Sequence, residues 1–189
     1  MARNKILESQ AFDDEFFSHF RFVEEDDAEF IFNLRSNKSL NTHLSQGDLS
    51  LKSQRKWIEK YKEREEMGDE YYFVIKHQAE NFGVVRMYDF QPQSFCWGSW
   101  IVLPTRPAGL VTFSALLVYE IGFEVLNYEQ SHFDVRNENK KVIDFHLRSG
   151  AKKVFRDEIN HYFIFERTNW PDFKEQSKLQ YSQHRVFCG

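Results

Sequence analysis

The chain has 189 residues, of which 41% are hydrophobic and 17% aromatic, so it is long enough to form one sizeable hydrophobic core. Its formal net charge is −4 at pH 7, whereas a nucleic-acid-binding surface is normally basic. The mean hydropathy is −0.62, and no apolar run approaches the roughly 18–20 residues that a transmembrane helix requires. These properties favour one globular domain over a membrane-spanning, collagen-like or largely disordered chain.

The first part of the chain predicts a strand and then a helix. Residues 1–15 are polar and are expected to form a loose segment before the domain, which we place at residues 16–168. The aromatic stretch from Phe16 to Val23 indicates a strand. Asp26 or Asp27 then suits the cap of a helix over residues 28–34, because a carboxylate accepts hydrogen bonds from free backbone N–H groups.

A second helix and three consecutive strands follow. Ser53 is expected to cap the helix, and Gly68 lies just past its end, where glycine adopts a left-handed conformation at the lowest cost. An alternating side-chain pattern then predicts a strand at 71–76, a second strand is expected at 82–88, and the aromatic and β-branched residues of 94–103 predict a third. A polar turn between the first two of these strands indicates an antiparallel hairpin.

The remainder of the chain alternates helices with strands. The expected elements are a long apolar helix at 110–126, a strand at 130–135, a helix headed by Asn139 and closed by Gly150, and strands at 153–155 and 159–166. Residues 169–189 are expected to be a polar tail. This order predicts a mixed α/β sheet, antiparallel in its N-terminal half and with a parallel crossover in its C-terminal half.

The number and spacing of the cysteines and histidines limit the kinds of site that the chain can form. Cys96 and Cys188 are too few for a disulfide framework or a zinc site, and the seven histidines lack the His-Glu-x-x-His spacing. The N-terminal sequence lacks the apolar core of a signal peptide. We therefore expect a cytoplasmic protein that uses no metal and has neither nucleic acid nor a membrane as a partner.

The turn between residues 103 and 111 is the first candidate functional segment. It joins a strand to the start of the long helix, and a helix N-terminus presents unpaired N–H groups and a partial positive charge that bind phosphate. Gly109 would allow close approach of the backbone to a pyrophosphate, and Arg106 would add a charged contact. A purely structural strand-to-helix turn explains the same pattern, so the residues alone leave both interpretations open.

Two motifs of this chain, one at residues 106–111 and the other at residues 139–151, occur in the same order as two motifs of the GNAT superfamily of N-acetyltransferases, and the chain resembles that superfamily. The pyrophosphate loop of that family, Gln/Arg-x-x-Gly-x-Gly/Ala, is similar to residues 106–111, except that Val111 replaces the small last residue and Pro107 removes one backbone donor. A later family pattern is matched by Asn139, Val142, Ile143, Phe145, His146, Gly150 and Ala151. The resemblance extends from about Phe17 to Glu166.

The resemblance implies the GNAT fold, a mixed central sheet with parallel splayed strands at the cofactor cleft and flanking helices. It also implies direct transfer of an acetyl group from acetyl-coenzyme A (acetyl-CoA) to a primary amine in a ternary complex. Shorter similarities, such as Trp97-Gly98-Ser99-Trp100-Ile101, point to a branch that acts on amino-sugar nucleotides in surface glycan synthesis. The alternatives are N-terminal acetylation of a protein, of the ribosomal-protein type, and a non-catalytic acyl-CoA-binding member. A homodimer is a further expectation.

The resemblance implies which residues hold acetyl-CoA. Because the pantetheine arm bonds to amides of a splayed strand, Ile101, Val102 and Leu103 are expected beside it. The other expected cofactor contacts are Arg106, Ala108, Gly109, Leu110, Val111, Asn139 and His146.

Three residues are candidates for proton transfer. His146 occupies the position at which the family commonly carries a tyrosine that protonates the leaving thiolate, and an imidazole with a pKa of about 6.5 serves there only if it is partly charged. Many relatives place a glutamate base on the preceding strand, but residues 95–100 contain no carboxylate. His132 and Asp134 share one face of a strand, so either is a candidate base, and a solvated or structural pair explains the same spacing.

The acceptor pocket is expected near the first helix and the loop after it. The polar residues Arg35, Asn37 and His43 are candidates for contacts with sugar hydroxyls or a nucleotide phosphate. The aromatic residues Tyr88, Trp97 and Trp100 are candidates for stacking on a base or a sugar. Solvation of the polar group and core packing of the aromatic group are the alternative interpretations.

Overall fold

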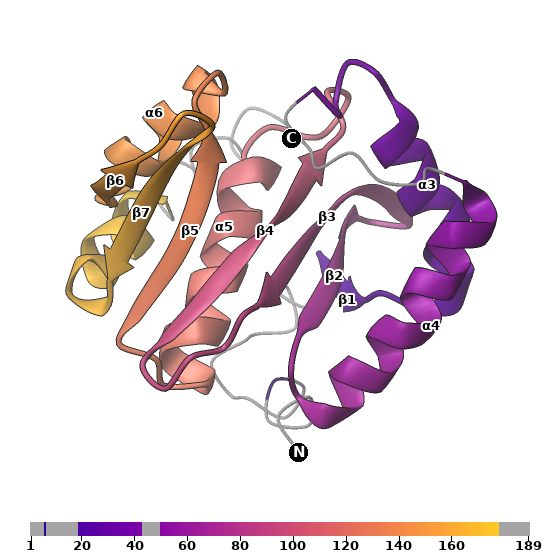
Figure 1. Ribbon diagram of the computed structural model, residues 1–189, viewed down its shortest axis with the longest axis horizontal. Coiled ribbons are helices and arrows are strands. Elements are labelled where there is room, and N and C mark those ends of the chain that lie inside the picture. The colour runs from indigo at the N-terminus through magenta and orange to yellow at the C-terminus, as the bar shows by residue number, and fades with distance from the viewer. Residues whose placement is uncertain (1–5, 7–18, 43–49, 178–189) are drawn as a thin grey trace. The chain divides into compact units, whose positions relative to one another are not determined.

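The computed structural model describes residue 6, residues 19–42 and residues 50–177 (Figure 1). In this part of the chain the strands form a seven-stranded mixed sheet with the order β1-β2-β3-β4-β5-β7-β6. The chain divides into two units, residues 1–89 with 98–106 and residues 90–97 with 107–189. The division crosses strand β4 (Ser94–Val102) between Trp97 and Gly98, so this strand contributes to both units.

The first unit contains an antiparallel set of strands and a pair of helices, in the predicted order. β1 (Phe20–Phe22) pairs with β2 (Tyr71–His77), and β2 pairs with β3 (Glu80–Tyr88), both antiparallel. Between β1 and β2 lie the 3-10 turn η1 (Glu25–Asp27) and the helices α3 (Ala28–Ser36) and α4 (Leu51–Met67). The predicted loose segment 1–15 and the start of the first predicted strand, residues 16–18, lie outside the described residues.

The helix ends follow local rules, with two corrections. Asp27 is the N-cap residue of α3, but its carboxylate makes no capping bond to that helix and instead accepts from the Arg21 guanidinium at 2.6 and 2.7 Å. Ser50 rather than Ser53 is the N-cap of α4, and its hydroxyl accepts from the Ser53 amide at 3.1 Å while the Ser53 hydroxyl accepts from the Ser50 amide at 3.1 Å. This reciprocal capping box satisfies two otherwise unpaired donors. At the other end, Gly68 has a φ of 85° and adopts the predicted left-handed conformation.

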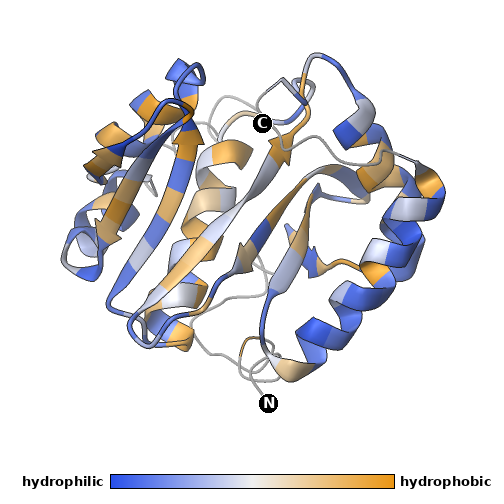
Figure 2. Cartoon of the chain, viewed as in Figure 1, coloured by the Kyte–Doolittle hydropathy of each residue, from blue (hydrophilic) through white to orange (hydrophobic). Residues whose placement is uncertain are grey.

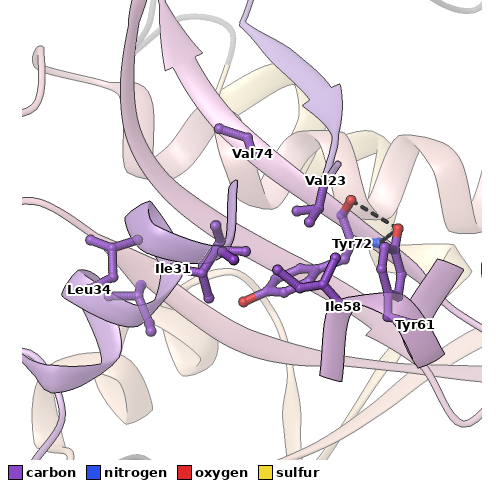
Figure 3. Close-up of a cluster of buried hydrophobic side chains, with 10 residues drawn as sticks. Val23, Ile31, Leu34, Ile58, Tyr61, Tyr72 and Val74 are labelled. Carbon is purple, nitrogen blue, oxygen red and sulfur yellow. Dashed lines mark hydrogen bonds between the residues drawn. The ribbon is translucent and has the colours of Figure 1, made fainter. Parts of the chain in front are cut away.

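The core of the first unit lies between its helices and its sheet (Figure 3). Tyr61 of α4 directs its hydroxyl at the backbone of Tyr72 in β2, accepting from the amide at 2.9 Å, and it also bonds to the buried carboxylate of Glu65. The buried cluster comprises Val23, Ala28, Ile31, Leu34, Ile58, Tyr61, Tyr72, Val74, Val84 and Ile101. Each large apolar side chain stabilises the fold by about 1.5–3 kcal/mol. Because Ile101 belongs to this buried cluster, its side chain packs in the core.

The second unit combines the rest of the sheet with a buried helix. β5 (Gln130–Arg136) and β6 (Lys152–Arg156) each pair antiparallel with β7 (Asn160–Glu166). The predicted helix 110–126 is α-helical in α5 (Leu110–Glu120) and π-helical in η2 (Ile121–Val125). Its mostly apolar colouring in Figure 2 agrees with its burial, whereas α4 carries a hydrophilic face. Within the described ranges, no helix is long and apolar enough to cross a bilayer.

The predicted polar tail begins as packed structure. After β7, the 3-10 turn η3 (Arg167–Asn169) leads into a helical segment at residues 170–177, and residues 178–189 lie outside the described part. Trp170 and Phe173 on this segment are buried against Tyr119 of α5, with ring centroids 6.1 and 5.7 Å away. The helical segment therefore belongs to the second unit, because its aromatic side chains complete the core of that unit.

Candidate functional site

The parallel part of the sheet is short and ends before its strands do. Among the described residues, β4 pairs with β5 only at Ser94–Gln130, Phe95–Ser131 and Cys96–His132. β4 continues to Val102 and β5 to Arg136 beyond the last of these pairs. His132 therefore occupies the position at which the parallel ladder stops.

β4 contains a strained residue just past this point. Ser99 has a φ of 48°, a left-handed conformation that is unfavourable for a residue with a side chain. A left-handed residue within a strand interrupts the pleat and changes the direction of the following side chains, as in β-bulges. Farther along, the Leu103 amide donates to the Phe82 carbonyl oxygen at 2.7 Å, so it is already engaged in the first unit.

Substitution of Ser99 tests this strain. Ser99→Gly is expected to leave the free energy of unfolding unchanged or to raise it by up to about 1 kcal/mol, because glycine adopts a positive φ without a steric penalty. Ser99→Val is expected to lower it by about 1–3 kcal/mol, because a β-branched residue is strained in this conformation. Urea unfolding of the three proteins measures both changes. A valine variant as stable as the parent would contradict the left-handed conformation.

The turn before α5 builds an anion-binding helix end. Gly109 is the N-cap residue with a φ of 83°, and its carbonyl oxygen accepts from the Phe113 amide at 2.9 Å. The amides of Val111 and Thr112 donate to no backbone oxygen among the described residues. These free N–H groups and the positive end of the helix dipole attract an anion.

Arg106 precedes this helix end in the sequence. Its guanidinium is exposed, and Nη1 lies 3.3 Å from the Leu103 carbonyl oxygen and 3.4 Å from that of Pro104. These contacts hold the side chain to its own turn. Because a guanidinium carries five N–H donors, it keeps others for a phosphate.

His146 lies in an aromatic cage in the second unit. It belongs to α6 (Lys140–Arg148), is 3% exposed, and packs on Phe133 with ring centroids 4.2 Å apart and on Trp97 at 5.3 Å. Burial lowers the pKa of His146 to about 3. The ring is therefore neutral near pH 7. A neutral ring does not fit the predicted role of His146 as the acid that protonates the leaving thiolate, because that role requires a partly charged imidazole.

His132 has a partner that the sequence did not indicate. Its Nδ1 lies 2.6 Å from the hydroxyl oxygen of Ser94, a β4 residue that is 3% exposed. Asp134 lies two residues farther along β5, is exposed, and is paired in register with Tyr162 of β7. The spacing of His132 and Asp134 could be seen in the sequence, whereas the register that brings Ser94 to His132 could not.

The polar acceptor candidates lie at the end of α3. The Asn37 side-chain oxygen accepts from the amide and the hydroxyl of Ser39 at 3.0 and 2.7 Å, so it stabilises the turn that follows the helix. Arg35 is partly exposed, and its carbonyl oxygen accepts from the Asn41 side chain at 3.0 Å. His43 lies outside the described residues.

The aromatic acceptor candidates differ in exposure. Trp97 is 4% exposed and packs on Tyr119, Phe133 and His146, which fits core packing, the alternative that the sequence left open. Tyr88 is partly exposed, and the Arg86 guanidinium lies 4.3 Å from its ring centroid. Trp100 is also partly exposed. The aromatic candidates that remain partly accessible are therefore Tyr88 and Trp100.

Asn139, a predicted cofactor contact, is the N-cap residue of α6. Its side chain makes no capping bond to the helix, while its carbonyl oxygen accepts from the Ile143 amide at 3.0 Å. The structure thus leaves the Asn139 side chain unused by the helix end. In the described ranges, no group of three or more His, Cys, Asp or Glu side chains is arranged to hold a metal ion.

Comparison with known proteins places these features in a family. Residues 19–152 match the model of the acetyltransferase (GNAT) domain. The chain is 48% identical to a protein of known structure, apo FdhC, described as a nucleotide-linked sugar GNAT, with a TM-score of 0.78 over 85% of this chain and 93% of that one. No curated protein matches the chain.

A second solved structure shares the fold at lower identity. It is the spermidine N-acetyltransferase from Vibrio cholerae in complex with CoA and spermine, with 18% identity, a TM-score of 0.68, and coverage of 80% of this chain and 96% of that one. At this identity the likeness concerns the fold alone. The domain match and the 48% identity together show that the chain belongs to the GNAT family and is an acetyl-CoA-dependent N-acetyltransferase.

Proposed function

We propose that this enzyme acetylates the amino group of a nucleotide-linked amino sugar. The observation that carries the proposal is the 48% identity to a nucleotide-linked sugar GNAT over 85% of the chain, against 18% for a spermidine N-acetyltransferase. The partly exposed aromatic rings of Tyr88 and Trp100 suit stacking on a base or a sugar, and Arg35 suits a phosphate.

The start of α5 is the proposed site for the pyrophosphate of acetyl-CoA. The free amides of Val111 and Thr112 would donate to its oxygens, and Arg106 would add a charge-assisted contact. Pro107 lacks an N–H, but both free amides lie after Gly109, so the loop keeps these donors. The Val111 side chain does not remove its amide, so the departure from the family pattern is compatible with binding.

The other predicted cofactor residues would act in different ways. The Ile101 side chain is buried in the first unit, so Ile101 and Val102 would offer backbone groups to the pantetheine arm. Leu103 would offer its side chain or carbonyl, because its amide is engaged by Phe82. Asn139 would contact the arm through its unused amide group, and the neutral ring of His146 would support the site by packing.

Proton transfer is assigned to His132, with Asp134 as the alternative base. The acceptor amine is an ammonium ion in water and must lose a proton before its lone pair can attack the thioester carbon. The amine nitrogen then attacks the thioester carbon and loses a second proton as the amide bond forms, the carbon–sulfur bond breaks with its electron pair leaving on the sulfur, and the thiolate of coenzyme A takes up a proton. Positioning of the two substrates supplies much of the rate enhancement.

Gly109→Val is expected to weaken acetyl-CoA binding by about 10-fold to 100-fold. A β-branched residue at a φ of 83° would cost about 1–3 kcal/mol unless the turn rearranges, and either outcome disturbs the free amides. Isothermal titration with acetyl-CoA measures the change. Gly68→Val is the matched control, because Gly68 has a φ of 85° at the end of α4 and should lose stability without losing affinity.

A thiol-release assay tests the acceptor. The panel contains amino-sugar nucleotides, the free amino sugars, spermidine and N-terminal peptides, each with acetyl-CoA. We expect release with one or more amino-sugar nucleotides at a kcat/KM at least 100-fold above the free sugars. Release with peptides or spermidine alone would overturn the acceptor class. Binding of acetyl-CoA without release from any amine would favour a non-catalytic member.

A further inference from the structure

Two polar side chains lie next to each other on the face of β2 and β3 that the helices of the first unit cover. Tyr72 of β2 and Arg86 of β3 are direct partners in the antiparallel register, so their side chains are neighbours on one face of the sheet. Tyr72 also belongs to the buried cluster that contains Ile31 of α3 and Ile58 of α4. The strand ladder therefore fixes the positions of both residues.

The hydroxyl group of Tyr72 is enclosed by the core of the first unit. Tyr72 is 2% exposed, and in Figure 3 its ring extends from β2 so that the hydroxyl oxygen lies on the side away from Tyr61. The backbone of Tyr72 bonds to the Tyr61 hydroxyl, but within the described ranges the Tyr72 hydroxyl itself makes no hydrogen bond. Burial raises the pKa of Tyr72 to about 12, against the opposing charges of Arg35 and Arg86. The hydroxyl group is therefore protonated near pH 7 and can donate.

Arg86 is the second polar group of this pair. Its guanidinium carbon lies 4.3 Å from the ring centroid of Tyr88 and 5.3 Å from that of Trp57, so two aromatic rings hold the group. Its Nε atom is buried, and the guanidinium makes no hydrogen bond to any residue that the structure describes. Its Nη1 atom lies 3.6 Å from the Glu70 carboxylate, which is too long for a hydrogen bond. Because the side chain keeps 20% of its surface exposed, its terminal N–H donors remain available to an anion.

The charges near this pair favour an anion. Arg35, Arg86 and Glu70 all act electrostatically on Tyr72. Glu70 is buried and already accepts from Nε of Arg64 at 2.6 Å, so its negative charge is largely compensated. The remaining charge beside the Tyr72 hydroxyl is positive. A diphosphate has several acceptor oxygens and suits a phenol donor next to a guanidinium better than a neutral sugar does.

We infer that Tyr72 and Arg86 determine specificity for the nucleotide of the acceptor by binding its diphosphate. This inference rests on the proposed function, which supplies the nucleotide-linked sugar. The oxygens of the diphosphate accept from the Tyr72 hydroxyl and from the Nη donors of Arg86, so binding pairs donors that the folded chain leaves unused. Neither residue reacts, and both act by holding the acceptor.

This set of donors is separate from the one proposed for acetyl-CoA. The start of α5, the proposed site for the pyrophosphate of the cofactor, belongs to the second unit, whereas Tyr72 and Arg86 belong to the first. Ile101, whose backbone is proposed to contact the pantetheine arm, lies in the same buried cluster as Tyr72. The first unit therefore contains both the proposed pantetheine strand and the proposed diphosphate site.

Isothermal titration with uridine, thymidine and guanosine diphosphates tests the pair directly. Saturating coenzyme A is present, so that these nucleotides do not bind at the start of α5. We expect at least one of them to bind the parent. Arg86→Gln should weaken that binding by about 10-fold to 100-fold and Tyr72→Phe by about 10-fold, because each removes a hydrogen bond to a charged group. Absence of binding to the parent, or unchanged affinity in either variant, would overturn the inference.

Arg64→Gln is the matched control. Arg64 also lies near the Trp57 ring, at 5.4 Å, and contacts the same Glu70 carboxylate, whereas Arg86 is the register partner of Tyr72. We expect the diphosphate affinity of Arg64→Gln to stay within about threefold of the parent. Phenylalanine keeps the buried ring at position 72, so the urea midpoint of Tyr72→Phe should stay close to that of the parent. A loss of affinity in Arg64→Gln as large as in Arg86→Gln would contradict the inference.

Steady-state kinetics show whether the pair acts in binding. With an amino-sugar nucleotide, Tyr72→Phe and Arg86→Gln should raise KM about 10-fold or more and leave kcat within about threefold, because the diphosphate is held equally in the ground and transition states. The kcat/KM for the free amino sugar should not change. Lower kcat with unchanged KM would refute the assignment. The titrations need no amine, so diphosphate binding that depends on Arg86, without acetylation of any amine, would refute the proposed function alone.

Discussion

Replacing His132 by glutamine is expected to lower kcat roughly 100-fold to 10,000-fold, the usual contribution of a positioned general base. Glutamine preserves the size and polarity of the side chain but cannot take a proton. His132 lies on β5, outside the turn that is proposed to bind pyrophosphate, so acetyl-CoA affinity should stay within about twofold of the parent. Thiol release under saturating acetyl-CoA measures kcat, and isothermal titration measures the affinity.

Asp134→Asn is the control that separates the two candidate bases. Asp134 is exposed, so its removal should reduce kcat by less than about 10-fold if it acts only as a neighbouring charge. A full loss in Asp134→Asn with an active His132→Gln variant would transfer the role of base to the carboxylate. Activity in both variants would show that the acceptor loses its proton to water before it binds.

Gly83→Ala is expected to destabilise the enzyme by about 3 kcal/mol or more, the upper end of overpacking costs. A Cβ atom at Gly83 would lie 2.2 Å from the carbonyl oxygen of Ile101 and 2.9 Å from the Cα atom of Val102. Both are backbone atoms, so relief requires that β3 and β4 move apart. Urea unfolding should show a lower midpoint. The affinity for acetyl-CoA should fall as well, because Ile101 and Val102 are proposed to offer it their backbone.

Gly98→Ala provides the comparison within the same unit. A Cβ atom there would come within 2.9 Å of the Tyr88 hydroxyl oxygen, which is the end of a side chain that can swing away. Its cost should stay below about 1 kcal/mol. Equal destabilisation by the two alanines would contradict the close approach of Gly83 to the β4 backbone.

Local features of the site could be predicted from the sequence. The strand-to-helix turn before residue 110 was predicted because turn residues such as Pro and Gly act on their immediate neighbours, and the structure has β4 ending at Val102 and α5 beginning at Leu110. The order of strands and helices followed from side-chain periodicity for the same reason. The shift of the α4 cap from Ser53 to Ser50 shows the limit, since both serines belong to one capping box.

Features that depend on residues far apart in the chain could not be predicted from the sequence. The sequence left His146 as a candidate acid, and only its packing on Phe133 and Trp97 shows a ring that burial keeps neutral. The left-handed conformation of Ser99 has no local signal, because serine does not favour it. The segment at 170–177 was predicted as part of a polar tail, because the packing of its few aromatic residues against α5 cannot be seen in the sequence.

The family motifs, the order of the elements and the helix end proposed for pyrophosphate could all be inferred from the sequence, because each depends on residues that are close together in the chain. The contact between Ser94 and His132 could be found only in the folded chain, because a parallel pairing joins residues 38 positions apart. The same holds for the division of β4 between two units, since no linker-like composition marks that point. Register and burial are set by long-range packing, which the local pattern of residues along the chain does not contain.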